Sequence, residues 1–165
     1  MNILTVSGSS RPNSANIRLL EKLPSLFPGK SFSRFTELDS IPLFSANAGQ
    51  ASLPKPVLNW KQALNLSDAL IICTPEYLHN IPAAIKNGLE WISESGELAG
   101  KKVLPITFTP HPPRGEKAMQ SLIWSLQALN AQIVVQLSLY QNESPLLQKN
   151  EELEILGAAI DLLEH

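Results

Sequence analysis

Short continuous apolar runs alternate along this chain with longer stretches in which apolar residues recur every three or four positions. The short runs predict strands, and the three- and four-residue spacing predicts amphipathic helices between them. Ala69–Cys73 is apolar throughout, so both of its faces must be covered, as in the middle of a parallel sheet. Strands that alternate with helices are joined by right-handed crossovers, which place helices on both faces of the sheet. The pattern therefore predicts an α/β fold.

Five strands and five helices are expected. The strands are Asn2–Val6, Ser31–Thr36, Ala69–Cys73, Lys102–Phe108 and Gln132–Tyr140, and the helices are Ala15–Leu26, one beginning near Pro56, Pro82–Glu94, Glu116–Leu129 and one marked by Leu153, Leu156, Ile160 and Leu163. Five strands suit a three-layer α/β/α, flavodoxin-like fold with a parallel sheet of order 2-1-3-4-5. Ligands of such sheets bind at the carboxyl ends of the strands, where strands one and three diverge. We therefore expect the loops after Val6, Cys73 and Phe108 to converge.

Composition restricts the classes of protein that the chain can belong to. Its 165 residues suit a single domain over 1–165, and 44% apolar with 17% charged residues is typical of a globular chain. A net charge of −2 argues against a nucleic-acid partner. The lone Cys73 fits a reducing compartment, and the first apolar run is too short for a signal peptide. No apolar stretch has the length of a membrane span, so we expect a soluble, cytoplasmic protein.

The first predicted strand runs directly into a hydroxyl-rich loop, Ser7–Asn16, which opens a helix. Backbone N–H groups, hydroxyls and one guanidinium there point toward one place, with the positive end of a helix dipole behind them, an arrangement that suits a phosphate. The alternative is a polar turn that only caps its helix. The loop has neither a Walker-type motif nor a Gly-x-Gly-x-x-Gly fingerprint. The candidate phosphate ligands are Ser9, Ser10, Arg11, Ser14 and Asn16.

The loop after the predicted strand Ala69–Cys73 is Thr74–Pro82, and it contains two prolines and an aromatic residue. Such a loop is stiff, and we expect it to form a wall against a flat ring, with backbone N–H groups directed at the ring's edge. The alternative is an ordinary rigid turn in which Asn80 caps the next helix. For Trp91 in that helix, packing in the core is the expected role.

Two stretches carry a resemblance to a known family. Ser7–Asn16 followed by Leu19-Leu20, and Pro75-Glu76-Tyr77 with Ile81-Pro82, Lys86-Asn87 and Trp91, closely resemble the NADPH-dependent FMN reductases. These flavodoxin-like enzymes include azoreductases, quinone reductases and chromate-reducing flavoproteins. Leu38–Leu43 is similar to that family's Asp-x-x-x-Pro-Leu segment, so the resemblance covers nearly the whole chain.

The resemblance implies a function. It implies two-electron reduction of flavin, quinone, azo or metal-oxyanion acceptors, with FMN as cofactor and NADPH or NADH as co-substrate. No catalytic acid or base and no metal ligand is implied, and family members are usually homodimers or homotetramers. By the resemblance, Ser9, Arg11, Ser14 and Asn16 bind the FMN phosphate, and Pro75, Glu76, Tyr77, Leu78, His79 and Asn80 border the isoalloxazine, with Thr109 as a further contact.

Two loops differ from the family pattern. Leu78-His79-Asn80 stands where the family usually has Asn, a small residue and Ser, and Thr107–Gly115 is rich in proline where the family is rich in glycine. Prolines lack the N–H donors and the conformational freedom of glycines. An alternative function is therefore a binding, electron-transfer or regulatory protein with weak or lost FMN binding. His79 and His111 form either a pair that protonates a reduced quinone or two unrelated loop histidines.

Overall fold

The computed structural model describes residues 1–46, 53–142 and 150–165. Its sheet has the order β2-β1-β3-β4-β5, with β6 also paired to β4, and every pairing is parallel. The strands are β1 (Asn2–Ser7), β2 (Ser31–Phe35), β3 (Ala69–Thr74), β4 (Lys102–Thr109), β5 (Gln132–Ile133) and β6 (Leu137–Tyr140). This confirms the predicted flavodoxin-like order.

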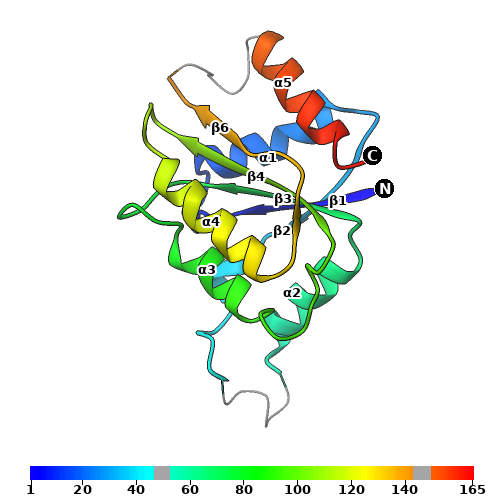
Figure 1. Cartoon of the computed structure of the whole chain (residues 1–165), viewed down its shortest axis with the longest axis vertical. Helices are drawn as coiled ribbons and strands as arrows, with labels where there is room; N and C mark the ends of the chain where they lie inside the picture. Colours follow the sequence, from blue (N-terminus) through cyan, green and yellow to red (C-terminus); the bar gives the residue numbers. More distant parts are fainter. Residues whose placement is uncertain (47–52, 143–149) are drawn as a thin grey trace.

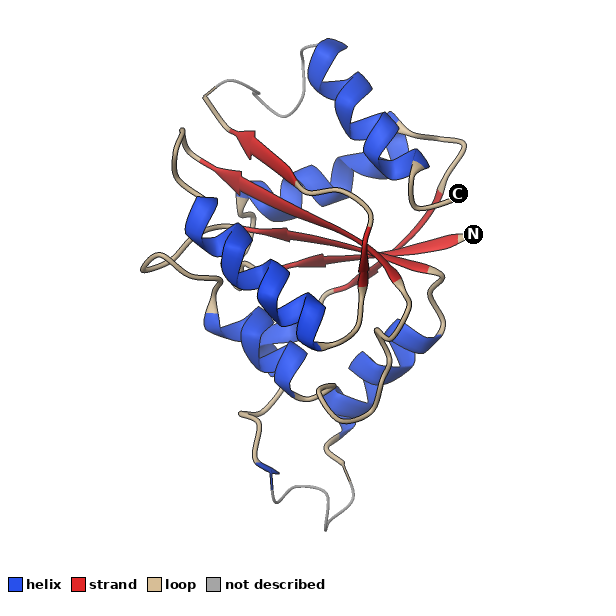
Figure 2. Cartoon of the chain, viewed as in Figure 1, coloured by secondary structure: helices blue, strands red, loops and turns tan. Residues whose placement is uncertain are grey.

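Helices cover both faces of the sheet (Figures 1 and 2). They are α1 (Ala15–Leu26), α2 (Lys55–Asn65), α3 (Ala83–Glu90), α4 (Glu116–Ala128) and α5 (Asn150–Asp161), with a 3₁₀ turn η1 (Leu38–Ser40) after β2. Leu19 and Leu23 of α1 join Ile160 of α5 in one apolar cluster. The other cluster contains Trp60 of α2, with residues of α3 and α4. One cluster lies on each face of the sheet, between the strands and the helices that cover them, and this gives three layers.

The last strand differs from the prediction. Gln132–Tyr140 was expected to be continuous, but it is divided into β5 and β6 by residues 134–136. Val103 pairs with Ile133 and Ile106 with Leu137, so three residues lie opposite two residues of β4. One of those two is Pro105, which has no N–H to donate. A proline inside a sheet requires an edge or a bulge, and the extra residue in the neighbouring strand provides that bulge.

The third helix is shorter than predicted. Helix α3 ends at Glu90, whereas the apolar spacing predicted helix up to Glu94. The N–H groups of Ile92 and Ser93 bond to carbonyls three residues back, so the chain tightens into turns before Gly96, which has a φ of 80°. Trp91 lies at this end and donates its Nε1–H to the Pro42 carbonyl at 2.7 Å. Its role is in the core, as predicted.

Membrane-spanning helices and metal-binding clusters are both absent from the described residues. None of their helices is both long and apolar enough to cross a membrane. The same residues contain no group of three or more His, Cys, Asp or Glu side chains that could hold a metal ion.

Candidate functional site

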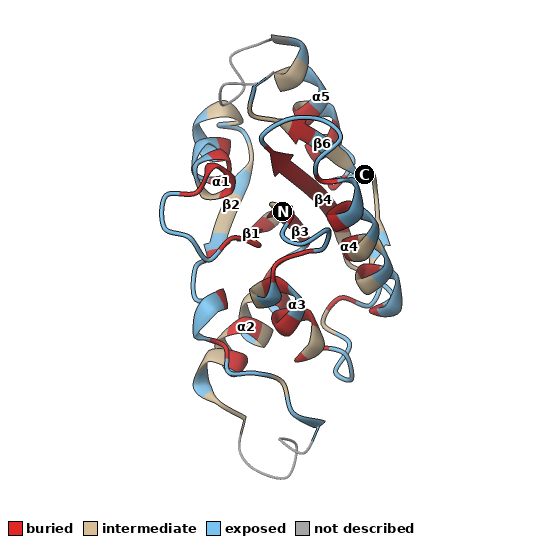
Figure 3. Cartoon of the chain, turned by 90° about the vertical axis from the view of Figure 1, so that its left-hand side faces the viewer, coloured by how far each residue is buried: buried red, intermediate tan, exposed pale blue. Residues whose placement is uncertain are grey.

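Three loops converge at the carboxyl ends of the central strands, as the sequence predicted. Figure 3 views the molecule from this end, with the buried strands β3 and β4 behind the loops. A cavity of about 190 Å³ is lined there by residues of all three loops. Ser9 and Arg11 come from the loop after β1, Pro75 from the loop after β3, and Phe108 and Pro110 from the end of β4.

The first loop turns close against β3. The N–H of Gly8 donates to the Cys73 carbonyl at 2.8 Å. A Cβ at Gly8 would lie 2.4 Å from Thr74 Oγ1, so only glycine allows this approach. Ser7 Oγ accepts from the Ser9 N–H at 3.1 Å, and Ser9 Oγ accepts from the Arg11 N–H at 3.3 Å. The loop is therefore held in shape by its own hydroxyl groups.

Helix α1 begins directly behind this loop. Ser14 is its N-cap, and its Oγ accepts from the Ile17 N–H at 3.2 Å. The remaining N–H groups of a first helical turn have no partner inside the helix, and together with the helix dipole they favour an anion. Ser14 and Arg11 both line the cavity beside this helix start. The local structure thus has the donor groups that a phosphate requires.

Asn16, at the start of α1, contacts the ends of two strands at the cavity. Its Nδ2 donates to the Phe108 carbonyl at 3.2 Å, and its Oδ1 accepts from Cys73 Sγ at 3.1 Å. Both partners are buried, and burial raises the pKa of the Cys73 thiol. The amide of Asn16 therefore ties α1 to β3 and β4, a role that the sequence did not reveal.

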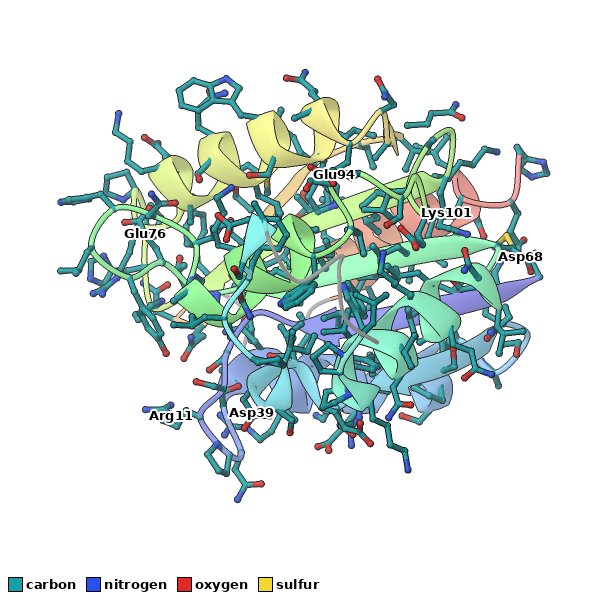
Figure 4. All side chains as sticks on the ribbon, turned by 90° about the horizontal axis from the view of Figure 1, so that it is seen from below. Arg11, Asp39, Asp68, Glu76, Glu94 and Lys101 are labelled. Carbon is teal, nitrogen blue, oxygen red and sulfur yellow. The ribbon has the colours of Figure 1, made fainter. Side chains whose placement is uncertain are left out.

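Arg11 is the charged side chain of the first loop at this edge of the sheet. Arg11 is exposed and makes no ion pair within the described residues. Figure 4 shows Arg11, Asp39 and Glu76 at one end of the molecule, with Asp68 and Lys101 at the other. Arg11 is thus available to an anion at the carboxyl edge of the sheet.

The second loop ends in a tight two-residue turn. The N–H and carbonyl groups of Tyr77 and Asn80 bond to each other at 2.9 Å in both directions. Leu78 and His79 have φ values of 50° and 59°, which a type I′ turn requires at both central positions. Leu78 is 98% exposed at the tip. The sequence did not predict this hairpin turn, because Leu and His are not the Asn and Gly that normally indicate it.

Glu76 lies beneath that turn and is only 7% exposed. Its Oε2 accepts hydrogen bonds of 3.1 Å from the N–H groups of Gly115, Lys117 and Ala118, which open α4. Its Oε1 is 3.6 Å from His79 Nδ1. The sequence placed Glu76 at the flavin, and it gave no indication of these contacts with a helix about forty residues further along the chain.

The third loop is closed on itself. The buried Thr109 hydroxyl donates to the Arg114 carbonyl at 2.5 Å. His111 and Arg114 form a turn, in which the Arg114 N–H donates to the His111 carbonyl at 3.0 Å. His79 and His111 both line a second cavity, of about 470 Å³, between the second and third loops. The two histidine loops therefore converge, as the sequence predicted.

The predicted site residues line three different cavities. The 190 Å³ cavity is lined by Ser9, Arg11, Ser14, Asn16, Pro75, Glu76 and Tyr77. The 470 Å³ cavity is lined by Glu76, Leu78 and His79, and Ser10 lines a third cavity, of about 310 Å³, toward β2. Asn80 and Thr109 line none of the three. Pro110, Arg114 and Gln141 also line the first cavity, and the sequence analysis missed all three as site residues.

The residues present fit FMN. Buried Ser9, exposed Arg11 and the start of α1 are a donor set for a phosphate. The 190 Å³ cavity alone is smaller than the roughly 300 Å³ at which ligand pockets usually begin. It shares Glu76 and Arg114 with the 470 Å³ cavity, so the two adjoin and together provide room for a phosphate and a ring. Pro75 and Tyr77 supply the stiff wall beside that space.

Comparisons with known proteins show the family and the fold of this chain. The sequence profile of the NADPH-dependent FMN reductases matches residues 1–144. Subunit CrdA of the NADH:(hydroxy)cinnamate reductase of Vibrio ruber is 31% identical over 121 residues, which are 73% of this chain and 59% of that protein. The quinone reductase of Escherichia coli strain K12 is 28% identical over 138 residues, covering 81% of this chain and 73% of the relative. The chain thus spans less than two-thirds of the Vibrio protein.

Solved structures share the fold. The flavoenzyme FerB of Paracoccus denitrificans, an NAD(P)H:(acceptor) oxidoreductase, superposes with a TM-score of 0.77 at 22% identity, covering 99% of this chain and 97% of that one. Flavodoxin 1 of Bacillus cereus superposes with a TM-score of 0.66 at 16% identity, covering 100% and 99%. The likeness to both confirms the flavodoxin-like fold. With a profile match over 144 of its 165 residues, the chain belongs to the NADPH-dependent FMN reductase family.

Proposed function

We propose that this protein is an FMN-dependent NAD(P)H oxidoreductase that reduces quinones, flavins or similar small acceptors by two-electron transfer. The observation that carries the proposal is the convergence of the hydroxyl-rich first loop and the stiff second loop on adjoining cavities. One loop has the chemistry to bind a phosphate, and the other has the shape to border a ring. Membership of the family supports the same conclusion.

The chain's own residues have defined parts in this function. Ser9, Arg11 and Ser14, with the start of α1, bind the phosphate, and Asn16 fixes that helix start against β3 and β4. Pro75 and Tyr77 orient the ring. Bound FMN would supply the hydride and electron-transfer chemistry between NAD(P)H and the acceptor, and these residues would hold it in place. The protein positions these partners, and we assign no catalytic acid or base.

Quinones are the proposed acceptors because several of the matching relatives are named for them. The Escherichia coli relative is a quinone reductase, and a Burkholderia relative, 34% identical over 93 residues, is a 2-hydroxy-1,4-benzoquinone reductase. The 470 Å³ cavity between the second and third loops is the expected acceptor site, since it lies beside the proposed ring position and is open to solvent at His79 and His111.

A flavin titration tests the proposal. The purified protein is expected to be yellow, or to quench FMN fluorescence on titration, and then to oxidise NADPH or NADH with a soluble quinone and no protein partner. A colourless protein that binds no added FMN would refute the proposal. Steady NAD(P)H oxidation by the purified protein would also exclude an electron carrier that depends on a separate reductase.

A second candidate is a binding or regulatory protein that has lost FMN, and the third loop favours it. Pro110, Pro112 and Pro113 have no N–H groups, and those of Gly115, Lys117 and Ala118 are bonded to Glu76. This loop therefore offers a flavin few donors. The absence of FMN binding, together with a cooperatively folded protein, would favour this candidate over the reductase.

We also propose a homodimer or homotetramer in the cytoplasm. Trp124 on α4 is 64% exposed, and Leu78 on the second loop is 98% exposed, so the surface offers apolar side chains that a second copy could cover. A lone cysteine suits a reducing compartment. Light scattering coupled to size exclusion measures the assembly, and a monomer at micromolar concentration would contradict it. Fractionation of cells that express the tagged chain measures the location.

A further inference from the structure

Helices α1 and α4 both begin at the edge of the sheet where the site lies, and their first turns differ in what they face. The first turn of α1 faces the 190 Å³ cavity. The first turn of α4 faces the Glu76 carboxylate, which accepts from three of its backbone N–H groups. A helix start favours an anion, and at α4 the chain supplies that anion from its own side chain.

We propose that Glu76 is a positioning residue, which sets the width of the space between the second and third loops by binding the start of α4. This inference rests on the proposed function, because that space is where the flavin ring and its acceptor would lie. In this proposal Glu76 bonds to α4 and does not contact the flavin itself.

The geometry supports a clamp. The two carboxylate oxygens face different loops, since Oε2 bonds to the start of α4 and Oε1 lies 3.6 Å from the His79 ring. Hydrogen bonds to a charged acceptor are roughly twice as strong as neutral ones. Gly115 precedes α4 with a φ of 109°, a conformation that favours glycine, and an added Cβ would lie 3.1 Å from Thr107 Oγ1 and Thr109 Cγ2, closer than ordinary contacts. The start of α4 is thus closely packed against the end of β4.

The prolines of the third loop make such a clamp necessary. A glycine-rich loop can bring several backbone N–H groups close to a flavin. Pro110, Pro112 and Pro113 have no N–H groups to offer, so the order of this loop must come from within the protein. The Glu76 bonds and the Thr109 bond to the Arg114 carbonyl supply it. The clamp thus stands in for the contacts that the loop cannot make with a ligand.

Glu76→Ala and Glu76→Gln test the proposal in the full-length protein. Ala removes the acceptor, while Gln keeps one neutral oxygen at the same reach. We expect Glu76→Ala to weaken FMN binding about tenfold or more, and Glu76→Gln to weaken it less. Hydrogen exchange at the amides of Gly115, Lys117 and Ala118 should accelerate in the same order. Glu94→Gln, which removes an exposed carboxylate with no bond among the described residues, is the matched control.

Chemical rescue distinguishes a clamp from a general loss of structure. Formate added to Glu76→Ala should occupy the vacated start of α4, and it should slow amide exchange and restore FMN affinity while leaving the wild type unchanged. Weakened FMN binding with unchanged exchange and no rescue would assign Glu76 to direct flavin contact and overturn the proposal. Unchanged exchange and unchanged affinity would also overturn it. If wild type binds no FMN, the proposed function fails, and the exchange and formate results still decide the clamp.

Discussion

Replacing Gly8 by Ala tests how closely the first loop must approach β3. An added Cβ would lie 2.4 Å from Thr74 Oγ1, 2.8 Å from Thr74 Cβ and 3.3 Å from Ile85 Cγ2. Ordinary contacts begin near ~3.5 Å, so the loop or the strand must move by about 1 Å. Thr74 is fully buried and pairs with Thr107 of β4, so it has no space to retreat. We therefore expect the loop to shift rather than the strand.

The expected cost is about 2–3 kcal/mol, in the upper part of the range for overpacked cores. For a chain of this size that corresponds to a fall of about 4–12 °C in Tm. The displaced loop should also bind FMN more weakly, because Ser9 and Arg11 move with it. Circular dichroism melts and fluorescence titration with FMN measure the two effects separately.

Gly29→Ala is the matched control, since nothing lies within 4 Å of the Cβ that it adds. It should leave FMN affinity unchanged and leave stability equal or higher by about 0.4–1 kcal/mol. Thr74→Ala in the Gly8→Ala background removes the nearest atom and should recover part of the lost Tm. Wild-type stability and FMN affinity in Gly8→Ala alone would refute the claim that this contact fixes the first loop.

Three further predictions concern single side chains. Arg11→Ala should weaken FMN binding by about 1.5–3 kcal/mol, or roughly 10- to 150-fold, while Lys22→Ala on the exposed side of α1 leaves the titration unchanged; equal affinities would mean that hydroxyl and backbone groups alone bind the phosphate. Leu78→Asn should raise the urea-unfolding free energy by about 0.5–1 kcal/mol, because Asn adopts a positive φ more easily and the exposed Leu loses no packing; a lower unfolding free energy would contradict the strain that we infer at the turn. The Cys73 thiol, whose pKa is raised by burial, should remain protonated at pH 8 and react with a thiol reagent only as fast as the protein unfolds; rapid labelling of the native protein would contradict this.

The sheet order and the position of the site followed from the sequence because they depend on strong, local patterns. The uninterrupted apolar run Ala69–Cys73 required a central strand, and alternating helices required parallel pairing. Once the order is 2-1-3-4-5, the loops that meet at the carboxyl edge follow from topology. Residue patterns therefore predicted both the fold and the place where the candidate ligands gather.

What the sequence did not reveal are contacts between residues distant along the chain. The bonds from Glu76 to α4 span about forty positions, and those from Asn16 reach Cys73 and Phe108. A glutamate in a loop and an asparagine at a helix start have many local uses, so their types alone do not indicate these partners. The turn at Leu78 was also missed, because the bonds between its flanking residues override the backbone preference of the two central ones.

Pro105 has a consequence for the unfolded chain. Val103–Phe108 is an apolar, uncharged segment of strong β-propensity, and such six-residue segments form stable intermolecular stacks when they are exposed before folding is complete. A proline at the centre of the segment blocks that stacking, because the stack would require the N–H that proline lacks. In the folded sheet, the missing N–H of Pro105 is accommodated by the bulge between β5 and β6. We therefore infer that this proline protects the nascent chain from aggregation, and that Pro105→Val would increase insoluble protein during expression even if the native sheet became more regular.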